Sequence, residues 1–239
     1  MFNAAEVRSN ATKSFYDRIS HAYDAIADAG EHRARERGLE ALAVQPGERV
    51  LEIGYGTGHS LVELAKAVGA TGRVCGVDIS TGMYQVAHHR LVAMGFADGL
   101  DRPQQQTTDA AGFDERVQLK VAETPPLPYE KHSFDVVTMS FTLELFPLDV
   151  IPVLLAEVRR VLKPGGRFGT VSMSTTPAGQ TDSLLERTYK WMHEHFPHIV
   201  DCQPIDVTRY VTDAGFRITQ HILLEIWTLP VAVVVGISD

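Results

Sequence analysis

The chain of 239 residues carries 22 Lys and Arg against 30 Asp and Glu, which gives a formal net charge of −8. With 44% hydrophobic and 22% charged residues, its composition is that of a globular protein and excludes a disordered or collagen-like chain. The sequence has no run of lysines and arginines that would form a basic surface for nucleic acid. The composition therefore favours a small-molecule site.

The N-terminal part of the chain is predicted to be helical. Apolar residues recur at steps of three and four between residues 10 and 29, the spacing of one face of an amphipathic helix. A second helix is predicted over residues 32–44, before Pro46 and Gly47, which stop a helix and turn the chain. We therefore expect residues 1–45 to form a helical cap on a single domain that spans residues 46–239.

The rest of the chain alternates strands with helices. Strands are predicted over residues 49–53, 74–78, 117–121, 134–140, 167–173, 217–224 and 227–235. Helices are predicted over residues 59–68, 81–94, 150–162, 182–195 and 206–214. Residues 95–115 should form a surface excursion, residues 163–166 a sharp turn, and the last two strands an antiparallel hairpin. The predicted fold class is α/β: a doubly wound, Rossmann-like, mostly parallel seven-stranded sheet with an antiparallel C-terminal hairpin and an N-terminal helical cap.

The strongest motif follows the first predicted strand. Glu52 precedes a loop that contains Gly54, Tyr55, Gly56, Thr57 and Gly58. Glycines at a strand-to-helix turn let the backbone approach a ligand and adopt positive φ. Asp78 ends the second strand, about 20 residues further on, where an acid can accept both hydrogen bonds of a ribose diol. The pattern predicts a nucleoside-cofactor site at the switch point of the sheet.

The spacing within this loop favours S-adenosylmethionine over a dinucleotide. A dinucleotide fingerprint reads G-x-G-x-x-G, whereas this loop reads G-x-G-x-G, with His59 where the third glycine would fall. The Glu52 carboxylate would repel a pyrophosphate but suits a ligand with an ammonium and a sulfonium. A nicotinamide-dependent oxidoreductase and a non-catalytic S-adenosylmethionine-binding regulator remain the alternatives.

The sequence resembles the class I S-adenosylmethionine-dependent methyltransferases, and among them the C-methyltransferases of ubiquinone and menaquinone biosynthesis. The resemblance is carried by Phe15–Asp24, Val50–Gly58, Gly76–Ser80, Leu127–Tyr129, Ser133–Val137 and Arg160–Gly166. It implies methyl transfer to a small, largely apolar acceptor such as a quinol. The segment Ser140–Glu144 lacks the arginine-asparagine pair of the quinone subgroup. The identity of the acceptor and the atom that is methylated therefore stay open, and a lipid head group is one of the acceptors that remain.

The resemblance also implies roles for individual residues. The glycine loop would line the methionine part of the cofactor, with Glu52 supporting its amino group, and Asp78 would hold the ribose. Met83 would pack on the adenine. The remaining expected cofactor contacts are Ile79, Val121, Ala122, Glu123 and Ser140. Where the family has an acid before Ala122 this chain has Val121, which leaves the Ala122 backbone N–H as the expected adenine contact.

Candidates for the chemistry itself are fewer. Glu144 lies beyond the fourth predicted strand among apolar residues that would raise its pKa, and it is the first candidate for a general base, ahead of His21 and His59. The alternative for Glu144 is a helix cap or a water-facing carboxylate. The expected substrate contacts are Tyr16 and Tyr23, from a helix that would cover the site, and Trp191.

No metal site is predicted, because His193, His195 and His198 do not share one helical face. Two cysteines, Cys75 and Cys202, exclude a disulfide framework, and Cys75 should be a buried small hydrophobe.

The first residues lack a secretory signal pattern. The longest apolar stretch, residues 222–237, is shorter than a membrane span. These features predict a cytoplasmic protein without stable membrane association. The sequence does not decide the oligomeric state, and a homodimer is possible.

Overall fold

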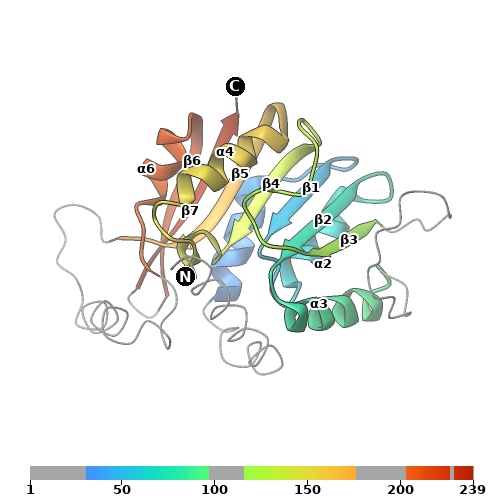
Figure 1. The fold of residues 1–239 in the computed structure, drawn as a ribbon. Coiled ribbons are helices and arrows are strands. Elements are labelled where there is room, and N and C mark those ends of the chain that lie inside the picture. The colour runs from blue at the N-terminus through green and yellow to red at the C-terminus, as the bar shows by residue number, and fades with distance from the viewer. Residues whose placement is uncertain (1–30, 97–115, 176–202, 227–228, 239) are drawn as a thin grey trace, which may run out of the picture.

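The computed structural model of the chain describes residues 31–96, 116–175, 203–226 and 229–238. Its strands are β1 (Arg49–Ile53), β2 (Arg73–Asp78), β3 (Val117–Val121), β4 (Phe134–Ser140), β5 (Leu162–Met173), β6 (Phe216–Ile226) and β7 (Leu229–Ser238). They form one sheet in the order β3-β2-β1-β4-β5-β7-β6 (Figure 1). Strands β1 to β5 pair in parallel, while β7 is antiparallel to both β5 and β6. The predicted doubly wound sheet with an antiparallel C-terminal hairpin is confirmed.

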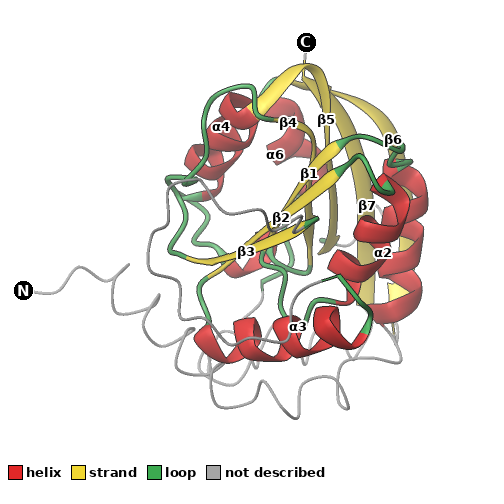
Figure 2. Ribbon diagram, turned by 90° about the vertical axis from the view of Figure 1, so that its right-hand side faces the viewer, coloured by secondary structure: helices red, strands yellow, loops and turns green. Residues whose placement is uncertain are grey.

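Helices cover both faces of this sheet. They are a helix over residues 31–42, α2 (His59–Val68), α3 (Thr81–Ala93), α4 (Ile151–Val161) and α6 (Val207–Asp213), with a short 3-10 helix η1 (Leu143–Leu145). Figure 2 shows α4 and α6 on one side of the sheet and α2 on the other. None of the helices in the described parts of the chain is long and apolar enough to span a membrane.

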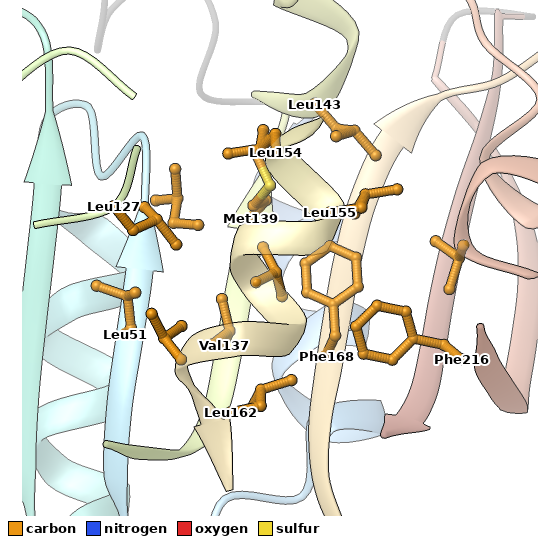
Figure 3. Close-up of a cluster of buried hydrophobic side chains, with 14 of the residues drawn as sticks. Leu51, Leu127, Val137, Met139, Leu143, Leu154, Leu155, Leu162, Phe168 and Phe216 are labelled. Atoms are coloured by element: carbon orange, nitrogen blue, oxygen red, sulfur yellow. The ribbon is translucent and has the colours of Figure 1, made fainter. Parts of the chain in front are cut away.

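The largest core cluster fills the space between the sheet and α4 (Figure 3). Leu154 and Leu155 of α4 are fully buried there, and the rings of Phe168 and Phe216 meet with centroids 5.5 Å apart. Each such side chain contributes about 1.5–3 kcal/mol on burial. This packing fixes the position of β4 against α4, and with it the start of the short 3-10 helix η1 that follows β4.

The helix over residues 31–42 packs on the opposite face, directly against β5. A Cβ added to Gly38 would lie 2.3 Å from Val171 Cγ2, and one added to Gly169 would lie 2.5 Å from Leu42 Cδ1. The helix therefore runs antiparallel to β5, which places its N-terminal end at the C-terminal edge of the sheet. This helix belongs to the predicted cap; residues 1–30 of that cap lie outside the described residues.

Most element boundaries agree with the sequence predictions, with one clear exception. Residues 163–166 do not form a separate turn, because β5 already begins at Leu162, which pairs with Phe134. The next pair is Val136 with Arg167, so Lys-Pro-Gly-Gly forms a bulge within the strand, with Gly165 at φ 74°. The predicted helix over residues 182–195 and most of the predicted excursion over residues 95–115 lie outside the described residues.

Candidate functional site

The glycine loop leaves β1 at the C-terminal edge of the sheet, between β2 and β4. The Gly54 N–H donates to the Val77 carbonyl at 2.7 Å, and the Gly58 N–H donates to the Tyr55 carbonyl at 2.9 Å. Gly54, Gly56 and Gly58 have φ of 71°, 51° and 82°, a region that L side chains avoid. The sequence thus turns sharply from strand into α2, with Gly58 as the residue before the helix.

The three glycines serve two different purposes. A Cβ on Gly54 would lie 2.2 Å from Thr142 Cγ2, and one on Gly58 would lie 2.9 Å from Ala87 Cβ. These two glycines allow close packing. A Cβ on Gly56 would meet no described atom within 4 Å, so no described residue blocks the approach of a ligand to the backbone there.

Asp78 lies at the end of β2, directly across from this loop. Its Oδ2 accepts a hydrogen bond from the Gly56 N–H, and its Oδ1 accepts one from the Ser80 N–H, both at 2.9 Å. Ser80 in turn caps α3, because its Oγ accepts from the Met83 N–H at 3.0 Å. Met83 is 2% exposed, and Ile79 is half-buried. The carboxylate is therefore held in one orientation by two backbone groups.

Glu52 is buried one residue before the end of β1, with 2% of its surface exposed. Burial raises the pKa of this carboxyl to about 8, while a hydrogen bond with Ser60 and the charge of Arg35 act in the lowering direction. Its Oε2 has no hydrogen-bond partner among the described residues. A buried carboxylate oxygen without a partner is costly, so the site is suited to a cationic hydrogen-bond donor.

The end of β3 is arranged differently from the sequence prediction. The Ala122 N–H donates to the Asp78 carbonyl at 2.9 Å and is therefore already used by the sheet, which removes support for its direct contact with adenine. Val121 pairs with Asp78 in the ladder, and Glu123 is exposed. These three residues do lie beside the predicted site, at the same edge as Asp78.

Tyr55 of the loop and Ser140 of β4 both have buried side-chain hydroxyl groups. The Tyr55 ring is 4% exposed and packs against β2, where a Cβ on Gly76 would lie 2.7 Å from Tyr55 Cδ1. Burial raises the pKa of its hydroxyl, so only the backbone of Tyr55 belongs to the loop surface. Ser140, at the end of β4, has a buried Oγ without a hydrogen-bond partner in the described part of the chain.

Glu144 lies in η1 and is 1% exposed. Its Oε2 accepts from Ser172 Oγ and its Oε1 from the Met173 N–H, both at 2.9 Å. Burial raises the pKa of Glu144 to about 7, against the lowering effect of these hydrogen bonds. The carboxylate thus ties η1 to the end of β5. It neither caps α4, which is preceded by Val150, nor faces water, so that alternative is wrong.

Several contacts of the site escaped the sequence analysis. Arg90 of α3 donates from its guanidinium to the Thr57 carbonyl and so fastens the loop to the helix that follows Asp78. Ser60 of α2 forms a hydrogen bond with Glu52, and the charge of Arg35 acts on the same carboxyl. No periodicity signals these residues, because each acts on a residue of another element.

His21, Tyr16, Tyr23 and Trp191 lie outside the described residues, as do the three histidines of the rejected metal pattern. Within the described ranges, no three His, Cys, Asp or Glu side chains are grouped to hold a metal ion. Cys75 is buried, as predicted.

Known sequences identify the family. Residues 4–210 match the model of the ubiE/COQ5 methyltransferase family. The chain belongs to this family. It is similar to a demethylmenaquinone methyltransferase of Symbiobacterium thermophilum, with 31% identity over 68% of this chain and 59% of the relative. It is 34% identical to one of Staphylococcus aureus over 63% of this chain and 52% of the relative. The chain therefore spans little more than half the length of these relatives.

Solved structures agree on the fold of this ubiE/COQ5 family member. An S-adenosylmethionine-dependent methyltransferase from Aquifex aeolicus superposes with a TM-score of 0.62 at 19% identity, over 92% of this chain and 98% of that one. A 1,6-didemethyltoxoflavin N1-methyltransferase from Burkholderia thailandensis, solved with S-adenosylhomocysteine, gives a TM-score of 0.67 at 16% identity, over 99% and 91%. The [4+2]-cyclase SpnF gives 0.71 at 14% identity, over 97% of each chain.

Proposed function

We propose that this protein transfers a methyl group from S-adenosylmethionine to a small, largely apolar acceptor. The observation that carries the proposal is the buried carboxylate of Glu52, whose Oε2 lacks a partner among the described residues, beside a loop that opens at Gly56. Membership of a methyltransferase family supports the same reaction.

The residues at the edge of the sheet fit S-adenosylmethionine in three places. An ammonium would supply the hydrogen bond that Glu52 Oε2 lacks and would stabilise its ionised form. The open space at Gly56 admits the chain that links the amino acid to the ribose. The Asp78 carboxylate offers about four acceptor positions, so it can hold ribose hydroxyls while it keeps its bonds to the Gly56 and Ser80 N–H groups.

The bound cofactor supplies a methyl group on a sulfonium, which is already activated for displacement. The protein then has to hold the acceptor in line with the methyl group and exclude water. Glu52 and Asp78 fix the two ends of the binding site, and Arg90 with Thr57 keeps the loop between them in shape. Where the acceptor must lose a proton, Glu144 is the described candidate to accept it, because burial already places its pKa at about 7.

The acceptor is proposed only as a class. The curated relatives are demethylmenaquinone methyltransferases, which makes a quinol the first acceptor to test. The segment from Ser140, the last residue of β4, to Glu144 lacks the expected arginine-asparagine pair, so other apolar small molecules belong in the same test. Tyr16, Tyr23 and Trp191 remain proposed acceptor contacts, and cytoplasmic location and a homodimer remain predictions.

The decisive experiment is binding followed by turnover. Isothermal titration should show binding of S-adenosylmethionine and S-adenosylhomocysteine and none of NAD; the reverse order of affinities would identify a nicotinamide enzyme instead. Radiolabelled S-adenosylmethionine is then incubated with demethylmenaquinol and, separately, with a cell extract, and the labelled product is identified. Cofactor binding without any labelled product would favour a non-catalytic regulator.

A further inference from the structure

Strand β6 ends the sheet, where it pairs with β7 alone among the described strands (Figure 1). Such an edge presents a row of backbone N–H and carbonyl groups that can pair with a further strand. Helix α6 precedes β6 and packs at its start, with Val211 and Phe216 in one core cluster. A helix of 7 residues is only about 10 Å long and covers about three residues of a strand. The second half of β6 therefore extends beyond α6.

A bulge divides β6 into two parts. Ile218 pairs with Gly236 of β7 and Gln220 pairs with Val235, so Thr219 is the extra residue. From Gln220 to Ile226 the pairing with β7 is regular. A bulge bends and twists an edge strand and interrupts pairing. The regular stretch 220–226 is therefore the part of the edge that can accept another strand.

This stretch is apolar on both faces of the sheet. Leu223 pairs with Ala232, which belongs to the core cluster on the side of α4 and α6, yet Leu223 is 49% exposed. Ile222 and Leu224 are half-buried and pack against the core cluster on the other face. Natural edge strands are usually protected by charges or by a covering element. An apolar edge of this kind is suited to a partner strand.

The stretch complements itself in one antiparallel register. When a two-fold axis passes through Leu223, this leucine lies opposite Leu223 of a second copy. On the same face, exposed His221 lies opposite Glu225 of the second copy, and an imidazole N–H can donate to a carboxylate. On the other face, Ile222 lies opposite Leu224 of the second copy. Directly opposite side chains in an antiparallel pair are in contact, so apolar groups meet apolar groups and each donor meets an acceptor.

The neighbouring registers lack this match. An axis through Ile222 would place Leu223 opposite His221 of the second copy. An axis through Leu224 would place Leu223 opposite Glu225 and bury a carboxylate against a leucine, which is unfavourable. Axes further along the strand shorten the pairing or move it into the bulge. The side-chain pattern thus selects a single register and a single kind of partner, a second copy of this chain.

We propose that two copies of this chain associate through antiparallel pairing of residues 220–226, with Leu223 on the two-fold axis, so that the two sheets form one continuous sheet. The inference goes beyond the proposed function and does not depend on it. Since β7 is antiparallel to both β5 and β6, β6 runs parallel to β5 and ends at the edge of the sheet that carries the candidate site. The two-fold axis reverses the strands of the second copy, so the two cofactor sites lie at opposite edges of the joint sheet.

The first test is sedimentation velocity of the whole chain. A single pair of edge strands forms a small interface, so the measurement extends to about 100 μM protein. We expect the unmodified chain to reach the mass of a dimer. Leu223→Asp places two carboxylates opposite each other and should raise the dimer dissociation constant about 10-fold or more. The control Val153→Asp also replaces an exposed apolar residue, which is 54% exposed on α4, and should leave the dimer intact.

A charge exchange tests the register itself. His221→Glu places like charges opposite each other, and Glu225→Lys removes the acceptor of His221; each should raise the dissociation constant about 3- to 10-fold. The double variant His221→Glu/Glu225→Lys creates a Glu–Lys pair between the copies and should return to within about 2-fold of the unmodified chain. The two positions lie about 13 Å apart along one strand, so they cannot compensate within one copy.

Circular dichroism melting confirms that each variant is folded, and titration with S-adenosylhomocysteine should give the same affinity for Leu223→Asp and the unmodified chain. A monomer at every concentration would overturn the inference, as would a dimer that Leu223→Asp leaves intact. A double variant no better than its two single variants would overturn the proposed register. Failure of all proteins to bind S-adenosylhomocysteine would contradict the proposed function but not this interface.

Discussion

The Gly56 N–H and Asp78 Oδ2 are joined by a hydrogen bond of 2.9 Å that links the loop after β1 to the end of β2. Because parallel strands end at the same edge of the sheet, this bond sets the spacing between the part of the site that we assign to the amino acid and the part that we assign to the ribose. The shape of the loop and the orientation of the Asp78 carboxylate therefore depend on each other.

Replacement of Asp78 should weaken cofactor binding more than it weakens the fold. We expect Asp78→Ala to lower the affinity for S-adenosylhomocysteine by about 1.5–3 kcal/mol, the cost of a lost charged hydrogen-bond partner. Asp78→Asn keeps an oxygen that can accept from the Gly56 N–H and should lose less. Isothermal titration measures both variants. Unchanged affinity in a folded Asp78→Ala protein would remove Asp78 from the site.

The glycine loop separates the effects of two neighbouring positions. Gly54→Ala combines positive φ with a Cβ 2.2 Å from Thr142 Cγ2, and we expect it to reduce the free energy of unfolding by about 2–5 kcal/mol. Gly56→Ala carries the strain without the clash and should cost about 1–2 kcal/mol. Its main effect should be on cofactor affinity, because the new methyl group occupies the space that we assign to the ligand.

Urea denaturation and titration with S-adenosylhomocysteine distinguish these two effects. Gly95→Ala is the matched control, since Gly95 has φ 76° and no described atom within 4 Å of an added Cβ, but lies at the far end of α3. It should show the strain of Gly56→Ala and the cofactor affinity of the unmodified chain. If Gly56→Ala binds the cofactor as well as Gly95→Ala does, the open space at Gly56 is not part of the binding site.

The sequence was sufficient to predict the sheet and the glycine loop because both depend on local signals. Alternating apolar runs, the glycine spacing and an acid after β2 all lie within short segments. Contacts such as Glu144 with Ser172, or Arg90 with Thr57, join residues far apart in the chain, and no periodicity encodes them. The bulge at residues 163–166 was missed for a related reason: its glycines signal a turn, while its pairing with β4 depends on the neighbouring strand.

Glu52 should make the stability of the ligand-free protein depend on pH. Its pKa is raised from 4.5 to about 8 in the folded chain, so between these values the unfolded chain loses its proton first and stability falls as pH rises. The loss should reach roughly 3–6 kcal/mol above pH 8. Glu52→Gln should therefore be stabilised relative to the unmodified chain at pH 8.5, with little difference at pH 4.5.

Thermal melts across this pH range measure the effect, and Ser60 provides a control of opposite sign. The hydrogen bond with Ser60 lowers the pKa of Glu52, so Ser60→Ala should increase the stability lost at high pH. The Glu52→Gln variant should also lose affinity for S-adenosylhomocysteine. A difference between Glu52→Gln and the unmodified chain that stays constant with pH would show that the carboxyl is not strained by burial.

Glu144 offers the sharpest test of the chemistry, because two roles predict different outcomes. As a general base it must be ionised, so kcat should rise with pH through about 7, the pKa to which burial raises it. Glu144→Gln is nearly isosteric and can keep hydrogen bonds to Ser172 and the Met173 N–H. We expect it to lower kcat by about 10²- to 10⁴-fold, to abolish the rise with pH and to leave the affinity for S-adenosylhomocysteine unchanged.

Ser172→Ala removes a hydrogen bond that lowers this pKa, so it should move the midpoint of the profile to higher pH. If Glu144→Gln lowers the melting temperature but keeps full kcat at every pH, Glu144 only ties η1 to β5, and the proton is accepted elsewhere.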